Sequence, residues 1–220
     1  MTLEFSLGSG AADREDTPCA VVAVFEDGPS PAAAAIDAAS GGAIAALGAS
    51  KDFVGKIGTT LVLHGLAGVT AARVLLVGMG ARKDFDARAF ERACGAAGKA
   101  LKRMPIGQAS TWLPELDVPG RDADWRVRAC ALAIDHACFR YTATLKPRDP
   151  DAPKLAKLIL VAGADANHGL DQARAIARGI SFARELGCLP PNLCTPSHIA
   201  AQAKAIADGH ADAVTLEVLE

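Results

Sequence analysis

Short apolar runs alternate along the chain with longer segments in which apolar residues recur every three or four positions. The runs fall at residues 19–25, 59–64, 73–77, 108–113 and 158–161, and each is expected to form a strand. Residues 59–64 and 73–77 flank a glycine-containing turn, so they are expected to form a hairpin or to lie side by side. Residues 158–161 are continuously apolar, as in a strand covered on both faces. This alternation predicts a layered α/β fold.

The first two predicted helices lie on either side of the first hairpin. Residues 31–47 form one of them, with Gly41 and Gly42 expected to break it into two pieces. Asp84 or Asp86 can cap the second helix, which runs to about residue 104. One face of the second helix carries Phe90, Ala93, Cys94, Ala97, Ala100, Leu101 and Met104.

Three further helices are predicted in the second half of the chain. Asp122 or Asp124 can cap one, Asp171 is expected to start another that reaches residue 186, and Thr195 with Pro196 begins the last, through about residue 207. The expected buried face of the first is Val127, Cys130, Ala131, Ile134, Cys138 and Tyr141. The expected buried face of the second is Ala173, Ile176, Ala177, Ile180 and Ala183.

Two of the remaining segments are predicted to be connections, and the last one is predicted to be a strand. Residues 146–153 are rich in proline and charge and are expected to form an exposed loop. Residues 189–192 contain two prolines and are expected to be an extended connector. Residues 214–219 alternate as a strand does, and such a strand needs a neighbour for its backbone groups. We therefore expect the protein to continue beyond Glu220.

Composition narrows the class of protein. Hydrophobic residues make up 50% of the chain and charged residues 22%, which is typical of a globular protein. Aromatic residues make up only 5%, so the core must rest on Val, Leu, Ile and Ala. The formal net charge of -2 gives no broad basic face for nucleic acid. Lys99, Lys102 and Arg103 form a local basic cluster, which is either a solvated helix end or a small patch for DNA.

The six cysteines do not indicate a metal site or a disulfide framework. Zinc fingers need close cysteine pairs, and none of these cysteines has C-x-x-C spacing. They are expected to be reduced, mostly buried thiols of a cytoplasmic protein. The first ten residues lack a signal-peptide pattern, and no stretch is apolar enough to span a membrane. The cysteines are Cys19, Cys94, Cys130, Cys138, Cys188 and Cys194.

Two glycine-containing segments are candidates for binding phosphate. Gly78-Met79-Gly80 follows a strand and precedes a helix, as a dinucleotide loop does, but Lys83 stands where the third glycine is needed. A tight strand-to-helix turn is the alternative interpretation of this segment. Gly55-Lys56 fails as a phosphate loop because Ile57 replaces the required Ser or Thr.

Side chains suited to catalysis are scattered. The five histidines, His64, His136, His168, His198 and His210, show no metal-ligand spacing. On a helix, Asp135 and His136 diverge by about 100°, and His136 and Cys138 do not face each other. Asp149 and Asp151 flank a proline in the predicted loop. The spacing therefore predicts no catalytic residue, no cofactor-binding residue and no metal ligand in this chain.

A junction motif gives the chain a resemblance to a known family. Residues 177–203 contain Arg184, Leu186, Pro190, Asn192, Thr195 and Pro196. This order resembles the linker of the leucyl (cytosol) aminopeptidase family, in which a helix ending in Arg-Asp/Glu-Leu is followed by Pro-x-Asn-x-x-Thr-Pro. Residues 77–80 also resemble the family's Val-Gly-Leu-Gly turn, and residues 141–146 its aromatic-rich stretch ending in lysine. Asn192 and Thr195 are expected to cap backbone groups in this connector.

The resemblance implies a three-layer α/β/α macro-like domain with a mostly parallel mixed sheet, followed by a linker helix. Residues 1–165 would be that domain, 166–190 the connecting helix and linker, and 191–220 the start of a truncated catalytic domain. In the family, two divalent metal ions, Mn or Zn, activate water in the catalytic domain. The family's ligand motifs, which resemble Tyr-Asp-Ser-Gly-Gly and Asn-Thr-Asp-Ala-Glu-Gly-Arg, do not occur in this sequence.

Besides a purely structural fragment left by truncation or proteolysis, two functions remain open from the sequence. The first is the N-terminal assembly and regulatory part of a cytoplasmic aminopeptidase, hexameric when full-length, that removes N-terminal residues, preferably leucine, from peptides. This chain alone would then be inactive. The second is a stand-alone module that binds a nucleotide or ADP-ribose-like ligand, or DNA.

Overall fold

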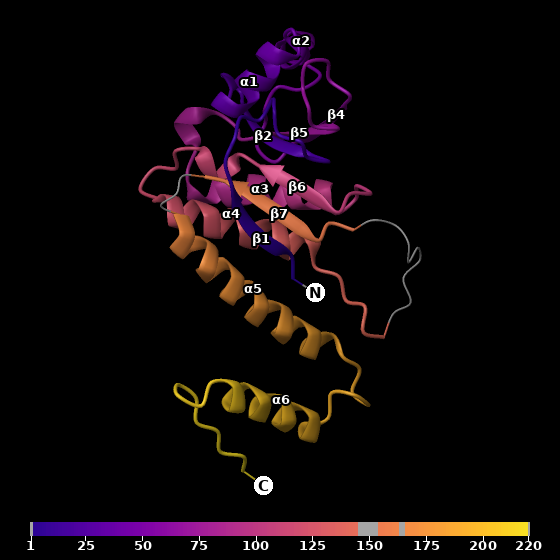
Figure 1. Cartoon of the computed structure of the whole chain (residues 1–220), viewed down its shortest axis with the longest axis vertical. Coiled ribbons are helices and arrows are strands. Elements are labelled where there is room, and N and C mark those ends of the chain that lie inside the picture. The colour runs from indigo at the N-terminus through magenta and orange to yellow at the C-terminus, as the bar shows by residue number, and fades with distance from the viewer. Residues whose placement is uncertain (1, 145–153, 163–165, 220) are drawn as a thin grey trace.

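The computed structural model describes residues 2–144, 154–162 and 166–219, which form one seven-stranded sheet with helices on both faces (Figure 1). The strands are β1 (Glu4–Gly8), β2 (Ala20–Phe25), β3 (Gly28–Pro29), β4 (Thr60–His64), β5 (Arg73–Gly78), β6 (Gln108–Thr111) and β7 (Lys157–Val161). The helices are α1 (Pro31–Ala39), α2 (Ala43–Ser50), α3 (Ala87–Leu101), α4 (Ala123–Cys138), α5 (Asn167–Cys188) and α6 (Pro196–Gly209).

The sheet is mostly parallel. Its order is β1-β7-β6-β2-β5-β4, and β3 pairs with β2 away from this path. The contacts of β1 with β7, β7 with β6, β6 with β2, and β2 with β5 are parallel. Only β4 and β3 pair antiparallel with their neighbours. The predicted mixed, mostly parallel sheet is therefore confirmed.

Two hydrophobic layers hold the helices to the sheet. In β2, Val21, Ala23 and Phe25 point into the layer beneath α3, α4 and α5, whereas Ala20, Val22 and Val24 point into the layer beneath α1 and α2. Period-two alternation with both sides apolar is what a strand between two helical layers requires. The predicted three-layer α/β/α architecture is therefore confirmed.

Side-chain caps fix where the helices begin. Of the two alternatives for each helix, Asp86 caps α3 and Asp122 caps α4, with carboxylates that accept the Ala89 N–H at 2.8 Å and the Trp125 N–H at 2.7 Å. Asp37, within α1, caps α2 by accepting the N–H of Ile44 at 2.7 Å. The break between α1 and α2 falls at Gly41 and Gly42, as predicted, and both take positive φ. Asp84 belongs instead to a 3-10 turn, Arg82–Asp84.

The second half of the chain departs from the sequence prediction at several places. Helix α4 ends at Cys138, so Tyr141 lies beyond it. Helix α5 begins at Asn167 and not at Asp171, because the N–H of Gly169 already bonds to the carboxylate of Asp124 at 2.6 Å. The helix also continues through Gly187 to Cys188.

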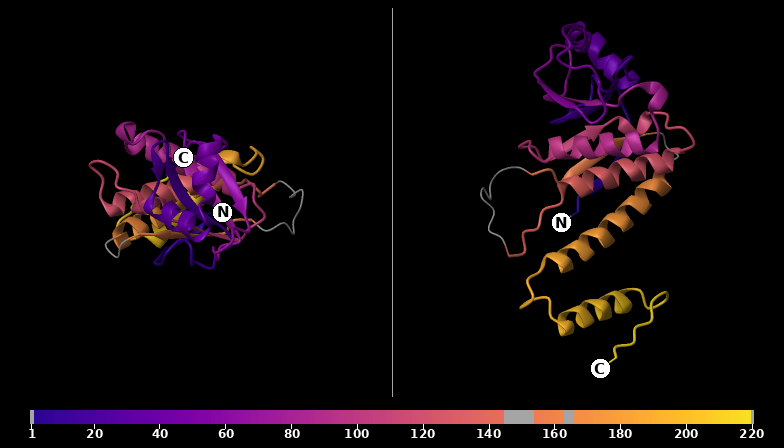
Figure 2. Two further views of the ribbon diagram at one scale, coloured as in Figure 1. Left: turned by 90° about the horizontal axis from the view of Figure 1, so that it is seen from above. Right: turned by 180° about the vertical axis from the view of Figure 1, so that it is seen from behind.

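The predicted buried face of α5 is only half right. Ala173 and Ala177 are buried against α4 and β1, but Ile176 is 41% exposed, Ile180 is 39% exposed, and Ala183 is exposed. The sheet domain ends beneath the first half of α5, so the second half has less surface to bury against (Figure 2). Residues 214–219 are not a strand, because no described strand lies beside them.

Other predictions concern elements at the edges of the structure. The sequence pattern did not predict strand β1. The strand predicted at residues 108–113 ends at Thr111, and the 3-10 turn Leu113–Glu115 follows it. The predicted loop at 146–153 lies outside the described residues. Among described residues, no single helix is long and apolar enough to cross a membrane, although α1 and α2 together pass that test with a 103° bend between them.

Candidate functional site

The glycine turn at residues 78–80 has no free N–H groups for a phosphate. The N–H of Gly78 donates to the Thr59 carbonyl at 2.9 Å, that of Met79 to Val24 at 2.9 Å, and that of Gly80 to Gly55 at 2.8 Å. A side chain at Gly78 would collide with the carbonyl of Lys56. These contacts support the tight-turn interpretation, in which glycine lets two backbone segments approach closely.

A cavity lies at the carboxyl ends of β2 and β6. The connections that follow these two strands lead to helices on opposite faces of the sheet. The cavity measures about 420 Å³ and includes Phe25, Trp112 and Arg82 in its lining. Open α/β sheets commonly bind ligands at such a point. Here, however, Arg82 pairs with Asp27 at 3.0 Å, and the Trp112 indole donates to the Gly10 carbonyl at 3.0 Å. The Arg82 charge is therefore balanced by Asp27 and the indole N–H has its acceptor, so neither side chain presents an unpaired charge to this cavity.

The acid, base and thiol candidates on α4 point to different places. Asp135 is buried and accepts the N–H of Leu3 at 2.8 Å, and burial raises the pKa of its carboxyl. His136 is exposed and lies against Arg184, whose Nη2 is 2.7 Å from Nδ1. Cys138 donates to the Gly98 carbonyl at 3.5 Å, and burial raises its pKa to about 11. A neutral thiol in this setting is not an activated nucleophile.

No metal centre is assembled by the described part of the chain. Groups of three or more His, Cys, Asp or Glu side chains that could hold an ion are absent from residues 2–144, 154–162 and 166–219. His64, His168 and His210 are exposed, and His168 contacts only Gln172 among the contacts described. Asp149 and Asp151 lie outside the described residues. The described residues thus do not fit a two-metal centre, which the resemblance assigns to the catalytic domain.

All six cysteines are free. Cys19, Cys94 and Cys130 are buried, Cys138 and Cys194 are half-buried, and Cys188 is exposed. Burial raises the pKa of Cys19 to about 12 and also raises that of Cys94, which packs beside Cys130. These buried thiols act as small apolar side chains of the core.

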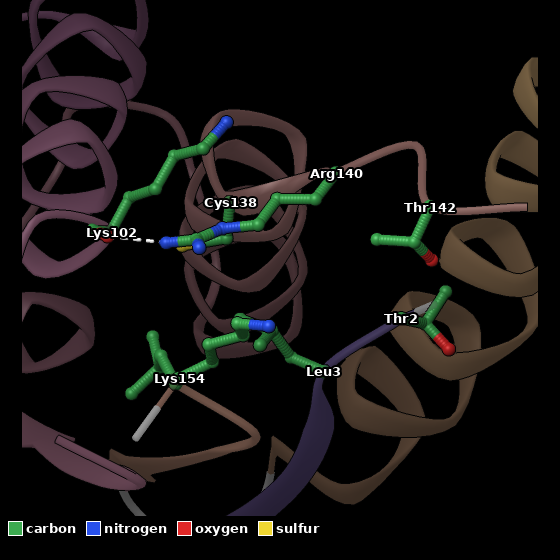
Figure 3. Close-up of a pocket in the computed structure, with 8 residues that line it drawn as sticks. Thr2, Leu3, Lys102, Cys138, Arg140, Thr142 and Lys154 are labelled. Atoms are coloured by element: carbon green, nitrogen blue, oxygen red, sulfur yellow. Dashed lines mark hydrogen bonds between the residues drawn. The ribbon is translucent and has the colours of Figure 1, made fainter. Parts of the chain in front are cut away.

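A cavity rimmed by cations lies at the opposite end of the sheet, where β1 and β7 begin. We call it the basic pocket, and its volume is about 260 Å³. Helices α3 and α4 both end at it, and Figure 3 shows Arg140 lying across Cys138 while Lys154 runs along the facing wall towards Leu3. Its lining consists of Thr2, Leu3, Lys102, Cys138, Arg140, Thr142, Lys154 and Leu155.

Two of the three cations cap helix ends reciprocally. Lys102, at the end of α3, donates to the carbonyl of Phe139 at the end of α4, at 2.8 Å. Arg140, just beyond α4, donates to the carbonyl of Lys102 at 2.6 Å. Basic side chains stabilise helix C-termini in this way. For Lys102, this supports the helix-end interpretation of the basic cluster. Lys99 and Arg103 face a different cavity, beside β4.

Sequence reasoning singled out Lys102 but missed the pocket. Its walls come from four segments that only the fold brings together: the start of β1, the ends of α3 and α4, and the residues before β7. Arg140 and Lys154 flank residues that read as a loop, and Leu3 precedes a strand that was not predicted. No local spacing could have joined them.

The junction residues fold as a helix-connector-helix unit. Thr195 caps α6 by accepting the N–H of His198 at 3.2 Å, and Pro196 occupies the first turn, as predicted. The N–H groups of Leu193 and Cys194 both donate to the Pro190 carbonyl at 2.9 Å. Asn192 is exposed and makes no side-chain bond to a described residue, so the expectation that it caps a backbone group is wrong.

The residues from α5 onward expose an unusual amount of apolar surface. All the exposed large hydrophobic residues described, except Val54, lie between residues 176 and 219. We call them the apolar C-terminal surface. Helix α6 carries part of it and stands away from the sheet domain in Figure 1 and in the right-hand view of Figure 2. Its members are Ile176, Ile180, Leu193, Ile199, Ile206, Val214, Leu216, Val218 and Leu219.

Comparison with known proteins gives consistent matches. Residues 21–147 match the N-terminal domain of the cytosol aminopeptidase family. A probable cytosol aminopeptidase of Xylella fastidiosa (strain M12) is 42% identical over 221 residues, covering 100% of this chain and 45% of that protein. One from Xanthomonas campestris pv. campestris (strain B100) is 46% identical over 208 residues, covering 94% of this chain and 42% of that protein. The chain thus spans about half the length of these curated relatives.

Solved structures share the fold. A mutant of tomato leucine aminopeptidase matches with a TM-score of 0.78 and 20% identity, covering 99% of this chain and 44% of that one. The bottromycin maturation enzyme BotP matches with a TM-score of 0.67 and 21% identity, covering 89% of this chain and 38% of that one.

Proposed function

The chain belongs to the cytosol aminopeptidase family, and we propose that it is the N-terminal assembly and regulatory part of a metal-dependent aminopeptidase. In this proposal a catalytic domain outside these 220 residues removes N-terminal residues, leucine preferred, from peptides. That domain would hold two divalent metal ions, Mn or Zn, which would supply an activated water for hydrolysis. The whole protein acts in the cytoplasm as a homo-oligomer, with a hexamer as the expected state.

The apolar C-terminal surface is the observation that carries this proposal. Exposed apolar patches of this kind mark surfaces that another part of a protein covers. Leu193, Ile199 and Ile206 lie 42–51% exposed along the connector and α6, and none of them belongs to either hydrophobic layer. The relatives are about twice as long as this chain, which supports the rest of such a longer protein as the occupant.

The packing of α5 and α6 supports a division of the chain into three parts. Residues 1–165 are the macro-like domain, residues 166–190 the connecting helix and linker, and residues 191–220 the start of the catalytic domain. Helix α5 packs on α4 and β1 through its first half, whereas α6 makes no comparable contact. The connector thus positions the catalytic part against the sheet domain while α5 stays fixed to the sheet domain.

Hydrolysis of leucine amide tests the activity. The 220-residue chain, supplied with Mn²⁺ or Zn²⁺, is expected to show no turnover, whereas a version extended to the length of the relatives should be active under the same conditions. Metal-dependent turnover by the pure 220-residue chain would contradict the proposal.

A pair of substitutions tests the docking surface. Ile180→Glu places a charge on the apolar C-terminal surface, and Val54→Glu places the same charge at a 38% exposed site outside it. In the 220-residue chain both should leave Tm nearly unchanged, since both side chains are exposed. In the extended protein only Ile180→Glu should lower Tm, by several degrees, because burying a charge without a partner is costly. Equal Tm values for the two extended variants would contradict docking at this surface.

A further inference from the structure

We propose that the basic pocket binds a small organic anion that carries a carboxylate or phosphate head on a short apolar body. The lining of this site belongs wholly to the sheet domain. The proposal rests on three observations: an excess of positive charge, unused hydrogen-bond donors, and an apolar floor.

The charges around the pocket do not balance. Lys102, Arg140 and Lys154 line it, and within the described residues no carboxylate forms an ion pair with any of them. The two helix C-termini together contribute about -1 elementary charge. Asp135 lies behind Leu3, where its carboxylate accepts a backbone N–H. Even with Asp135 ionised, the three cations outweigh the negative charges that the described residues contribute.

Donors remain after the helix ends are satisfied. Each lysine ammonium has three donors and each guanidinium five, whereas Lys102 and Arg140 spend one bond each on a helix carbonyl. Helix capping therefore uses only some of the hydrogen-bond donors of Lys102 and Arg140. It does not account for Lys154, which is half-buried and bonds to no described residue. An anionic head between Arg140 and Lys154 would use these donors in charge-assisted bonds.

The side chains at the floor of the pocket favour a ligand whose body, the part beyond the anionic head, is uncharged. Leu3 and Leu155 provide apolar side chains, and the Cys138 thiol stays protonated because burial raises its pKa to about 11. Thr2 and Thr142 stand at one side with hydroxyl groups (Figure 3). A volume of about 260 Å³ lies below the roughly 300–1,000 Å³ of sites for drug-sized molecules. A short branched or linear chain fits this space better than a nucleotide.

Calorimetric titration of the 220-residue chain tests the proposal with defined probes. The anions are 4-methylpentanoate and n-butyl phosphate, with inorganic phosphate as the head alone and 4-methylpentan-1-ol as the body alone. We expect at least one organic anion to bind, with an affinity that falls as salt rises. We expect the alcohol not to bind, and inorganic phosphate to bind more weakly than butyl phosphate. The stronger of the two organic anions identifies the natural head group as carboxylate or phosphate.

Matched variants locate the binding. Lys154→Gln removes a cation that stabilises no described contact, so the fold should be unaffected, and affinity should fall roughly fivefold or more. Lys83→Gln removes the same charge from an exposed position beyond the carboxyl end of β5 and should leave affinity within about twofold. Absence of binding by both organic anions, equal losses in the two variants, or equal affinity for inorganic and butyl phosphate would each overturn the proposal.

Discussion

Gly95 and Gly98 lie one turn apart on α3 and meet different surroundings. A Cβ at Gly98 would lie 2.8 Å from the Cβ of Ala137 and 2.9 Å from the Cα of Ile134 on α4. A Cβ at Gly95 would meet no atom within 4 Å. The small residue at position 98 thus lets the two helices approach closely, whereas the glycine at position 95 has no such role.

Alanine substitutions at these two positions should change stability in opposite directions. Gly98→Ala forces α3 and α4 apart and should lower the free energy of unfolding by about 1–3 kcal/mol. Gly95→Ala only improves helix propensity and should raise it by about 1 kcal/mol. Urea unfolding followed by circular dichroism measures both. A loss of stability in Gly95→Ala, or none in Gly98→Ala, would show that the α3–α4 packing is looser than described.

At the scale of the element, polar contacts along its length fix α5 to the sheet domain. The Gly169 N–H bonds to Asp124 at 2.6 Å, and Arg174 donates to the Phe5 carbonyl of β1 at 2.8 Å. Near its other end, the guanidinium of Arg184 lies 4.9 Å from the ring centre of Phe139 and contacts His136. These polar contacts position a helix whose apolar face is only partly covered.

Removing the last of these contacts should loosen the second half of α5. Arg184→Ala should speed hydrogen exchange of the backbone amides of residues 184–188, because a cation–π contact and a side-chain bond worth about 1 kcal/mol are lost. Arg178→Ala, on the same helix but exposed and without a described partner, is the control. Unchanged exchange in Arg184→Ala would mean that the contact with α4 does not fix the helix end.

Elements with a strong local period could be predicted from the sequence. The buried face of α3 was foreseen at Phe90, Ala93, Cys94, Ala97 and Leu101 because a single stripe of apolar residues follows the helical repeat. Periodicity reports which residues are apolar, but not how far the neighbouring surface extends. Ile176 and Ile180 were therefore assigned to a core that does not reach them. The alternating residues 214–219 similarly lack a partner strand within the described chain.

Features created by distant segments could not be predicted in the same way. Strand β1 has only five residues, and its strand character comes from the ladder that it forms with β7. The basic pocket depends on that ladder, because pairing brings Leu3 beside Leu155 and beneath the ends of α3 and α4. The tight turn at residues 78–80 was foreseen, but the segment that fills it, residues 55–59, was not.

At the scale of the whole molecule, the structure has a packed part and an extended part. The sheet, α3 and α4 share one continuous core, and α1 and α2 cover the other face. Helix α6 contributes no residue to either core (Figure 2). The free energy needed to open each part locally should differ accordingly.

Limited proteolysis with trypsin measures this difference. Lys204 in α6 and Lys99 in α3 are both exposed lysines within helices. Cleavage after Lys204 should come early, because α6 can unfold without disturbing a core, whereas cleavage after Lys99 requires the sheet domain to open. Mass spectrometry of the fragments identifies the sites. Cleavage at both lysines at similar rates would contradict the proposed division between the sheet domain and residues 191–220.

The pairing of β1 with β7 has a consequence for how the protein is made. Glu4 lies opposite Lys157, so the first strand of the sheet along the chain pairs with the last one. Until β7 emerges, β1 has no partner and the edge of β6 stays open, and closing so long a loop is slow. A nascent chain thus carries an exposed edge from the synthesis of β6 until β7 has emerged. Pairing of residues 4–8 with β7 is therefore the step that completes the sheet. A translational pause before β7 would prolong the period in which the β6 edge is open and the chain is most prone to aggregate.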